Sequence, residues 1–577
     1  MAHIQDFFTK LFNSLDAKPL PGWIHEECSL DELEAVGYFD GTTLAGLILE
    51  MPLGKVGTGD YIVVEILRQL DTQCLDVLAD IFRLRLANHP SEVLEDAWKL
   101  CYANLIAKVR RPETAKQFRP IAILPVLSKL YSKLILFLAR SHMRELRAPQ
   151  FAFRTQFQPH EVVFILRALI ERAIEWNIPI WILDGDIAKA YDNTFHADIL
   201  DSIIEAGCPP PLASAWIREI SGMGVQMRLG SEHTGTIFRN KALFQGDPSA
   251  PFLFNHTLDR PLFKFWCLSQ KNRWGIPVKN GDAKVYVSIF AFADNYWLLA
   301  TSPAELQSML PVWMSLLREH GWNTPVEEIT YCTTALDSDY IKPINFEGHT
   351  IKRAPRKGGF KVLGTMITCD VCDDVELNRR IASAWASFFK FKPILLCKAI
   401  ALRDRFKAFS RAIHPALFWC AGSWTLRVDQ LSKLRGVQRS MIRKMLHFKF
   451  RGDEDMQSFM KRTESSISHF MHTHNVQCFT DVYFRTIFRW AGKLVQISEQ
   501  FPDRLTSLVF QHKDWDWIQK LAANYNGRQQ HGRRLRIWRW ERPFYKCFGD
   551  NWKSIACCPE EWTSNESHFI TWKRYNN

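Results

Sequence analysis

The strongest constraint on the fold is an apolar segment with a single acid near its middle, residues 285–301 (VYVSIFAFADNYWLLAT). Two β-rich runs flank Ala293, Asp294 and Asn295, and Asp and Asn are turn formers, so the segment predicts a hairpin with Asp294 at its tip. Both arms are apolar on both faces, which predicts that the hairpin lies inside the protein. A carboxylate at the tip of a buried hairpin indicates a functional site, and an ordinary Asx turn is the alternative.

A second acidic segment lies at residues 177–207 (NIPIWILDGDIAKAYDNTFHADILDSIIEAG). An apolar strand from Ile178 to Leu183 runs into Asp184 and Asp186, which are two residues apart and therefore share one strand face. Two carboxylates at the exit of a buried strand are costly unless they are paired or bind a metal. The alternative is that an acid caps the following helix. That helix is expected to carry on one stripe Tyr191, Phe195, Ile199 and Ile203.

A basic loop separates two predicted strands within residues 104–124, and a helix is expected after the second strand. A hairpin that grips phosphates requires such a cluster of cations, whereas a solvated basic loop is the alternative. The basic residues of this loop are Lys108, Arg110, Arg111, Lys116 and Arg119.

A Gln245-Gly246 turn precedes another predicted helix, which Pro248 and Pro251 introduce. Glycine has no Cβ, so Gly246 lets the backbone approach another group closely. Taken alone, this motif predicts a turn.

The chain has 577 residues, so several lobes are expected rather than one core. Its 73 Lys and Arg residues exceed its 61 Asp and Glu residues by 12, and a basic surface attracts polyanions such as nucleic acid. A basic protein without such a partner is the alternative. The start of the sequence lacks a secretory signal, which predicts an intracellular protein, nuclear or cytoplasmic. No apolar run reaches the roughly 18 residues that a membrane helix needs, so no membrane partner is expected.

The pattern from about residue 375 onward is helical, and the stretch 526–544 mixes basic residues with aromatic ones. Such a mixture suits binding to single strands or to a nucleic-acid backbone. The residues expected to bind in this way are Arg533, Arg534, Arg536, Arg539, Trp538 and Trp540.

Two groups of potential metal ligands are not interpreted as metal sites. Cys369 and Cys372 have CxxC spacing but no second pair at zinc-ribbon distance. The cluster of His469, His472, His474 and Cys478 is interpreted as a surface cluster.

Taken in order, these segments resemble the conserved blocks of the reverse transcriptases of non-LTR (LINE-type) retrotransposons. Each block alone is weakly specific, but their order and spacing hold over nearly the whole chain. The resembling segments are 54–60 (GKVGTGD), 105–111 (LIAKVRR), 118–133 (FRPIAILPVLSKLYSK), 150–154 (QFAFR), 186–192 (DIAKAYD), 245–255 (QGDPSAPFLFN), 292–295 (FADN), 361–367 (KVLGTMI), 414–446 and 531–562.

The resemblance implies an α+β right-hand polymerase with fingers, a palm on an antiparallel sheet, a helical thumb and a basic helical C-terminal region. The implied boundaries are residues 1–95 for an N-terminal extension and the start of the fingers, 96–180 for the fingers, 181–360 for the palm, 361–450 for the hinge and thumb, and 451–577 for the basic, Trp-rich C-terminal region.

The resemblance also implies RNA-directed DNA synthesis by two-metal nucleotidyl transfer, with two Mg²⁺ ions, or Mn²⁺ in their place. The implied metal ligands are Asp186, Asp294 and the backbone carbonyl of Ile187, the two acids being the catalytic residues. The implied nucleotide-binding residues are Lys108, Arg119, Tyr191, Gln245 and Gly246. Asp184 and Asn295 are weaker candidates. Nucleic acid would also contact Arg110, Arg111 and Lys116.

The partners implied are an RNA template, a DNA primer or target, deoxynucleoside triphosphates and an endonuclease supplied in trans. Three residues depart from the family pattern. Asn295 stands where the family has a second acid, Glu328 lies near the usual place of a Lys, and Ala250 replaces a Ser. These departures keep open the alternative of a catalytically degenerate nucleic-acid-binding relative. A group II intron maturase-like splicing cofactor is a second alternative.

Overall fold

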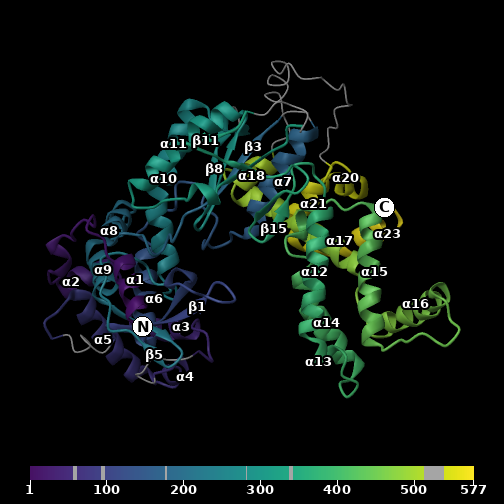
Figure 1. Ribbon diagram of the computed structural model, residues 1–577. Coiled ribbons are helices and arrows are strands. Elements are labelled where there is room, and N and C mark those ends of the chain that lie inside the picture. The colour runs from purple at the N-terminus through teal and green to yellow at the C-terminus, as the bar shows by residue number, and fades with distance from the viewer. Residues whose placement is uncertain are drawn as a thin grey trace.

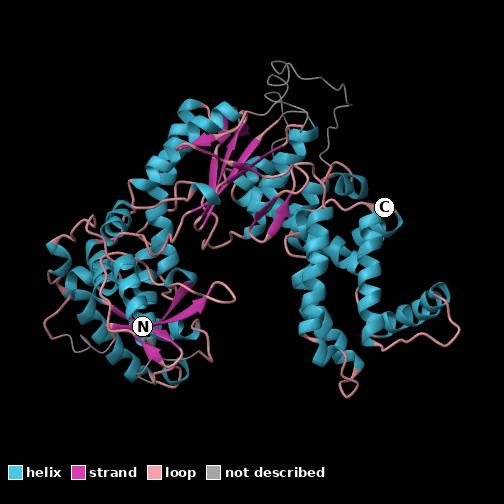
Figure 2. Ribbon diagram, viewed as in Figure 1, coloured by secondary structure: helices cyan, strands magenta, loops and turns pink. Residues whose placement is uncertain are grey.

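Three regions follow one another along an arch in the computed structural model, which describes residues 1–55, 62–91, 98–175, 179–280, 283–336, 342–511 and 539–576 (Figure 1). A lobe around the N-terminus is drawn in purple and blue, a sheet with covering helices lies at the centre, and an arm of green helices extends beyond it. Figure 2 shows that strands lie in the first two regions while the arm is helical. This mixed content agrees with the α+β class that the sequence predicts.

In the residues that the structure describes, six helices of the N-terminal lobe precede the central sheet in the sequence. They are α1 (Ala2–Phe12), α2 (Leu30–Val36), α3 (Gly41–Leu49), α4 (Val64–Leu67), α5 (Thr72–Ala87) and α6 (Val126–Arg140). Two of them begin at reciprocal capping boxes, Ser29 with Glu32 at α2 and Asp40 with Thr43 at α3, which satisfy backbone N–H groups that have no partner within the helix. Residues 56–60 of the block 54–60 (GKVGTGD) lie outside the described residues.

A four-stranded sheet joins these helices, with strand order β2-β1-β4-β5. Its strands are β1 (Leu100–Ala107), β2 (Phe118–Ile123), β4 (Gly224–Leu229) and β5 (Glu232–His233). β1 and β2 pair antiparallel, with Ile106 opposite Arg119, and this confirms the predicted hairpin around the basic loop. Helix α1 packs on this sheet by burying Phe8 and Phe12 in a cluster with Cys101 of β1. The N-terminus of the chain is therefore part of the core of this lobe.

The central sheet has five strands in the order β13-β10-β3-β9-β8. They are β3 (Trp181–Asp186), β8 (Ile289–Phe292), β9 (Asn295–Ala300), β10 (Thr330–Thr333) and β13 (Lys352–Arg353). The pairs are antiparallel except for the short β10–β13 pair, which is parallel. β8 and β9 form the predicted hairpin, with Phe292 opposite Asn295 and both arms buried.

Hydrophobic cores cover both faces of this sheet. Leu183 of β3 and Leu298 of β9 belong to one core, while their neighbours Ile182 and Leu299 belong to the other. Alternate residues point to opposite faces, so a strand buried on both sides needs an unbroken apolar run. The covering helices are α7 (Pro159–Glu175) on the second face and α10 (Ala250–Asn272) and α11 (Pro303–Arg318) on the first. Helices α8 (His196–Glu205) and α9 (Pro210–Gly222) belong to the same core as α10 and α11, and α9 packs on α5 and α6 of the N-terminal lobe.

One boundary in this region differs from the prediction. Helix α8 begins at His196, with Phe195 as its N-cap, so Tyr191 and Phe195 precede the helix and do not continue its stripe. Residues 187–195 are held instead by a turn, in which Asn193 N–H donates to the carbonyl of Lys189 at 2.9 Å. The expected stripe was wrong because tertiary contacts to this turn, and not helix periodicity, place Tyr191.

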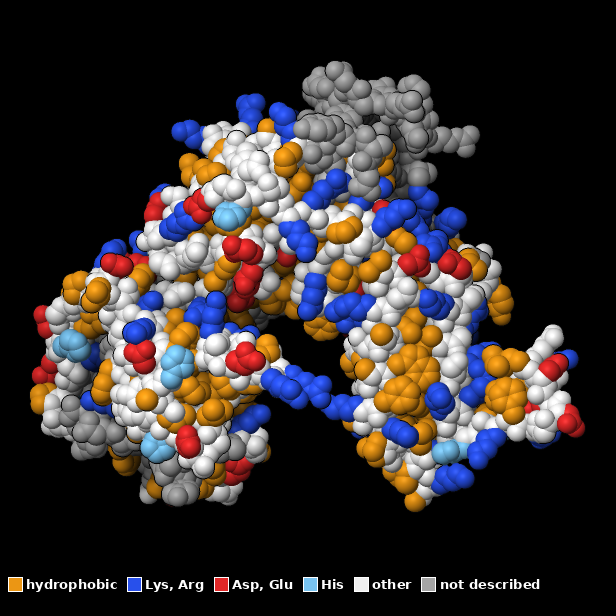
Figure 3. Space-filling model, in the orientation of Figure 1, with side chains coloured by type: hydrophobic (Ala, Val, Ile, Leu, Met, Phe, Trp, Pro, Cys, Tyr) orange, Lys and Arg blue, Asp and Glu red, His pale blue; other side chains and the backbone are white. Residues whose placement is uncertain are grey.

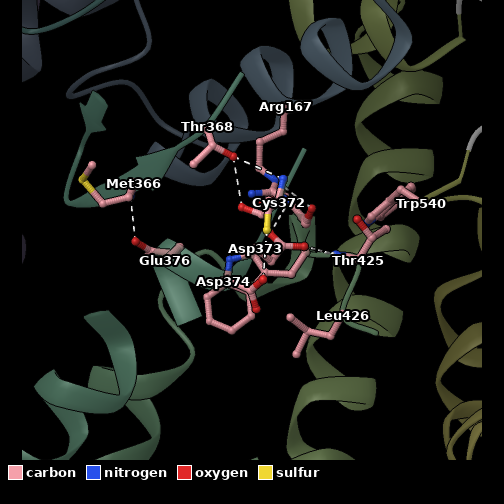
Figure 4. Close-up of polar contacts among 12 residues, drawn as sticks. Arg167, Met366, Thr368, Cys372, Asp373, Asp374, Glu376, Thr425, Leu426 and Trp540 are labelled. Atoms are coloured by element: carbon pink, nitrogen blue, oxygen red, sulfur yellow. Dashed lines mark hydrogen bonds and ion pairs between the residues drawn. The ribbon is translucent and has the colours of Figure 1, made fainter. Parts of the chain in front are cut away.

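The helical arm consists of α12 (Asp374–Lys390), α13 (Lys392–Leu395), α14 (Leu402–Leu417), α15 (Val428–Met445) and α16 (Met456–Thr473). It joins the central region at a buried ion pair, in which Arg167 of α7 binds the Asp373 carboxylate at 2.5 Å (Figure 4). The other carboxylate oxygen of Asp373 accepts from Thr425 N–H at 3.0 Å. Arg167 also donates to the carbonyl of Ser423 at 3.0 Å. One acid thus fastens α7, the start of α12 and the segment before α15.

The C-terminal helices pack around α17 (Phe479–Gln500). They are α18 (Leu505–Gln511), α20 (Arg542–Phe548), α21 (Trp552–Cys557), α22 (Pro559–Ser564) and α23 (Glu566–Tyr575). Trp540 is 3% exposed, and its Nε1 donates to the carbonyl of Gly422 at 2.7 Å. The prediction that Trp540 binds nucleic acid is therefore wrong, because its ring fills the core. Arg539 lies beside it, while Arg533, Arg534, Arg536 and Trp538 lie outside the described residues.

The remaining elements are short. They are the hairpins β6 (Ile276–Asn280) with β7 (Ala283–Val287), β11 (Asn345–Phe346) with β12 (His349–Thr350) and β14 (Phe360–Val362) with β15 (Thr365–Ile367), and the 3₁₀ helices η1 (Gly22–His25), η2 (Ala115–Gln117), η3 (Val326–Glu328) and η4 (Ala421–Ser423). None of the helices in the described ranges is long and apolar enough to cross a membrane.

Candidate active site

Asp186 and Asp294 lie next to each other at the ends of paired strands. Asp186 is the last residue of β3 and sits opposite Asn295, the first residue of β9. The Ile187 N–H donates to the carbonyl of Asp294 at 3.0 Å, which joins the strand exit to the hairpin tip. Two carboxylates more than 100 positions apart in the sequence are thereby brought together, as the sequence interpretation requires of a shared site.

A cavity of about 140 Å³ opens beside these two acids. It lies between the basic β1–β2 loop, the turn after β3 and helix α1. Residues predicted as site residues that line it are Asp186, Ile187, Asp294, Lys108, Lys116, Arg119, Tyr191 and Gln245. The lining also includes Phe7, Phe8, Leu11, Phe118, Pro120, Lys189, Ala190 and Asp192. Seven other predicted residues are described but do not line it, namely Asp184, Gly246, Asn295, Arg110, Arg111, Arg539 and Trp540.

Burial raises the pKa of both Asp186 and Asp294. The pKa of Asp186 rises to about 7 because the carboxyl is buried and because Asp294 and Glu328 add negative charge nearby. Burial also raises the pKa of Asp294, against the opposing effects of Asn295 and Arg119. Two acids that repel each other in a shielded site favour a cation between them. Glu328 itself is exposed, and it adds negative charge where the family has a Lys.

The donor set fits a hard divalent cation. Two carboxylates and the adjoining backbone carbonyl of Ile187 supply oxygens only, as Mg²⁺ prefers, and this ion usually completes its shell with water and phosphate oxygens. Across the described ranges, no group of three or more His, Cys, Asp or Glu side chains could hold a metal ion. A metal at Asp186 and Asp294 would therefore depend on ligands from water or substrate.

Asn295 contacts the neighbouring acid directly. Its Nδ2 donates to Oδ1 of Asp294 at 3.2 Å. An amide can orient the carboxylate in this way but adds no charge to hold a cation. Asp184 lies two residues before Asp186 on β3 and does not line the cavity, and burial raises its pKa to about 7.

The Gln245-Gly246 turn docks against strand β2. Gly246 has a φ of +132°, and a Cβ at this position would overlap the carbonyl oxygen of Ala122. The Ala122 N–H donates to the carbonyl of Gln245 at 2.9 Å. The close approach expected for Gly246 is confirmed, and its partner is the edge of β2. This contact holds Gln245 at the wall of the cavity.

Tyr191 forms part of the cavity wall through an aromatic stack. Its ring lies 4.8 Å from that of Phe254 in α10, at an interplanar angle of 16°. Its carbonyl accepts from Leu243 N–H at 2.8 Å, which ties the turn to the segment before Gln245. The stack thus holds the ring, and the backbone hydrogen bond holds the turn that carries it.

Several residues of the site and its surroundings were not predicted from the sequence. Helix α1 supplies Phe7, Phe8 and Leu11 to the cavity, and no local pattern in the sequence indicates this. Lys189 and Asp192 also line it, and their spacing of three and six residues from Asp186 was the available signal. Gly185 is needed inside β3, because a Cβ there would overlap the Tyr296 ring.

The Cys and His groups do not form metal sites in the described parts of the chain. Cys372 donates from its Sγ to the Asp374 carboxylate at 3.0 Å, and Cys369 is buried.

Residues 107–367 match the family model described as reverse transcriptase (RNA-dependent DNA polymerase). The chain carries a reverse transcriptase domain. This match covers every candidate residue of the cavity except those of α1, so the two acids, the basic loop and the Gln-Gly turn all belong to the reverse transcriptase domain.

Similar proteins come from non-LTR elements. The "Retrovirus-related Pol polyprotein from type-1 retrotransposable element R2" of Popillia japonica is 25% identical over 225 residues, which cover 39% of this chain and 30% of that protein. A protein of the same name from Bradysia coprophila is 27% identical over 209 residues, covering 35% and 22%. The "RNA-directed DNA polymerase from mobile element jockey" of Drosophila melanogaster is 30% identical over 165 residues, covering 27% and 17%. The resemblance to non-LTR reverse transcriptases is confirmed, and the chain spans less than a third of these relatives.

Proposed function

We propose that this chain is an RNA-directed DNA polymerase of a non-LTR retrotransposon, built as a right hand. In this proposal the β2-β1-β4-β5 sheet belongs to the fingers, the five-stranded sheet is the palm, and α12 to α15 form the thumb. Figure 3 shows an opening between the N-terminal lobe and the helical arm, with Lys and Arg side chains along its edges. Such an opening with a basic edge suits the backbone of a template–primer duplex.

One observation carries the proposal. Asp186 and Asp294 line the same cavity as Lys108, Lys116 and Arg119. Nucleotidyl transfer needs carboxylates that hold divalent ions at one end of the site and cations that bind the triphosphate at the other end. The chemistry of the lining residues provides both ends.

Each of these residues has its own role in the proposed reaction. Bound Mg²⁺, held by Asp186, Asp294 and the Ile187 carbonyl, would stabilise charge on the attacking and leaving oxygens. Lys108 and Arg119 bind the triphosphate by charge-assisted hydrogen bonds. Tyr191, locked by its stack on Phe254, crowds a 2′-hydroxyl and so favours deoxynucleotides. Gln245 positions template and nucleotide from the opposite wall.

Primer extension tests this function. Purified protein is given a primed RNA template, Mg²⁺ and deoxynucleoside triphosphates, and extension products are resolved by length. Asp186→Asn and Asp294→Asn should each abolish extension, while Asp201→Asn, an exposed acid on α8, serves as the matched control and should extend normally. Full activity of either cavity variant would exclude that residue as a metal ligand.

The second candidate function is nucleic-acid binding without catalysis, which Asn295 and Glu328 favour. Under this alternative, the protein binds the primed template tightly but extends no primer. Asn295→Asp adds back the missing acid and separates the two candidates further. A higher extension rate at limiting Mg²⁺ would show that the wild-type site is active but binds the ion less well than it could.

A further inference from the structure

The cavity contains more positive charge than the two predicted phosphate-binding residues supply. Lys108, Lys116, Arg119 and Lys189 all line it. Lys241 lies just outside, where its Nζ donates to Oδ1 of Asn193 at 3.3 Å. Like charges that gather at one place repel each other, and a polyanion is the ligand that relieves this repulsion.

Besides Asp186 and Asp294, one more acid, Asp192, lines the cavity among the residues that the structure describes. The lining thus contains four cations and three acids. With all of these groups charged, it carries a net positive charge that suits an anionic ligand.

Lys189 is placed for contact with the phosphates of a nucleotide. It lies on the turn that leaves β3, three residues after Asp186, so this cation and the acid belong to one short segment. Its backbone adopts a φ of 49°, uncommon for a residue other than glycine. The Asn193 N–H bond to its carbonyl, at 2.9 Å, holds the turn in this shape.

Helix α1 closes the side of the cavity next to Lys189 with apolar side chains. The ring centroid of Phe7 lies 4.8 Å from Nζ of Lys189, and Phe8 and Leu11 complete this wall. An apolar wall excludes water, which strengthens the attraction between a cation and a phosphate. The volume of about 140 Å³ is well below the roughly 300 Å³ at which sites for whole small-molecule ligands begin, so the enclosed space suits a phosphate tail.

We propose that Lys189 is a further phosphate-binding residue, which contacts the triphosphate of the incoming nucleotide beneath the wall formed by α1. It supplies the cation that the chain lacks at Glu328. This proposal rests on the polymerase function proposed above and names one more residue of the same substrate site.

Steady-state kinetics provide the first test. Lys189→Ala should raise KM for deoxynucleoside triphosphates about tenfold or more, the effect of losing one charge-assisted hydrogen bond, with primed-template affinity unchanged. Lys189→Arg should avoid most of this rise in KM, because it keeps the charge. Lys264→Ala, which removes an exposed Lys of α10, is the matched control. An unchanged KM in Lys189→Ala would overturn the proposal.

Binding of inorganic tripolyphosphate gives a second test that needs no catalysis. Calorimetry should show binding to the wild type and to Lys264→Ala, and binding about tenfold or more weaker in Lys189→Ala. Equal binding by wild type and Lys189→Ala would overturn the assignment. If the wild type extends no primer yet binds tripolyphosphate through Lys189, polymerase activity fails while the phosphate subsite stands. A melting curve of each variant confirms that it is folded.

Discussion

At the residue scale, the acids of the cavity are held in a protonation state that a cation would change. Burial raises the pKa of Asp186 and of Asp294, and the negative charge of Asp294 raises the pKa of Asp186 further. Asn295 orients Asp294 without adding charge. A divalent ion would lower these pKa values, because it favours the ionised carboxylates. The site therefore binds protons and metal in competition.

This competition predicts a pH dependence of stability in the absence of divalent ions. The folded-state pKa of Asp186, about 7, lies above the unfolded value of about 3.9, so the folded protein binds more protons between these values. The contribution of Asp186 to stability is therefore present at low pH and lost as pH rises through about 7. Melting temperatures in EDTA at pH 5.5 and 7.5 measure this contribution to stability. Asp186→Asn should flatten the difference, and Mg²⁺ should raise stability mainly at the higher pH.

Gly185 gives a second prediction at this scale. Gly185→Ala places a methyl group against the buried Tyr296 ring, and overpacking of this kind costs about 1–3 kcal/mol. Chemical denaturation measures the loss in free energy of unfolding. Gly46→Ala in helix α3 is the control, since a Cβ there meets open space and helix propensity favours Ala by about 1 kcal/mol. Equal stability of Gly185→Ala and wild type would contradict the packing described.

At the element scale, helix α1 is both a core element and a wall of the site. Phe8 and Phe12 are 1% and 2% exposed and pack on β1 and β4, while Phe7, Phe8 and Leu11 line the cavity. The Gly235 N–H donates to the Gln5 side chain at 3.0 Å, and Asn13 donates to the carbonyl of Phe238 at 2.9 Å. Loss of this helix should therefore affect the sheet and the cavity together.

Phe8→Ala tests that coupling. Removing a buried Phe ring costs about 3–5 kcal/mol, because the cavity left behind collapses only in part. Hydrogen exchange should show faster exchange of the β1 and β4 amides than in the wild type. Phe137→Ala removes a ring that is 53% exposed and should change stability by less than about 0.5 kcal/mol. Unchanged protection of β1 in Phe8→Ala would show that α1 is not a core element.

At the scale of the whole molecule, one buried ion pair links the central region to the helical arm. Asp373 is 2% exposed and binds both Arg167 and the Thr425 N–H (Figure 4). Beside it, the Met366 N–H donates to the Glu376 carboxylate at 2.7 Å, and Arg427 binds Asp374 at 2.9 Å. These contacts fasten the start of α12 to the central region, and α12 belongs to the arm that borders the opening in Figure 3.

Arg167→Ala should loosen this joint. It leaves a buried carboxylate without its cation, which costs about 3–5 kcal/mol. Limited proteolysis should then cut near residues 366–376 sooner than in the wild type, and products of primer extension should become shorter. Arg435→Ala, on the exposed face of α15, is the control. An unaltered cleavage pattern in Arg167→Ala would mean that other contacts hold the arm.

Local patterns in the sequence were sufficient to predict four features. These are the hairpin at 289–300, the strand that ends at Asp186, the basic β1–β2 loop and the helical pattern from about residue 375. Each depends on neighbours within about ten positions, through the period of two of a strand, turn-forming residues and helix periodicity. The position of both acids at the ends of such elements followed from the same patterns.

The tertiary structure alone decided which distant segments meet. It buried Trp540 against Gly422, placed Tyr191 before α8, and brought α1 and Lys189 into the cavity with Asp186. These contacts join segments up to about 180 positions apart, and they depend on which apolar surfaces pack together rather than on local periodicity. The sequence by itself determined the acids of the site, and only the packing of the lobes determined what surrounds them.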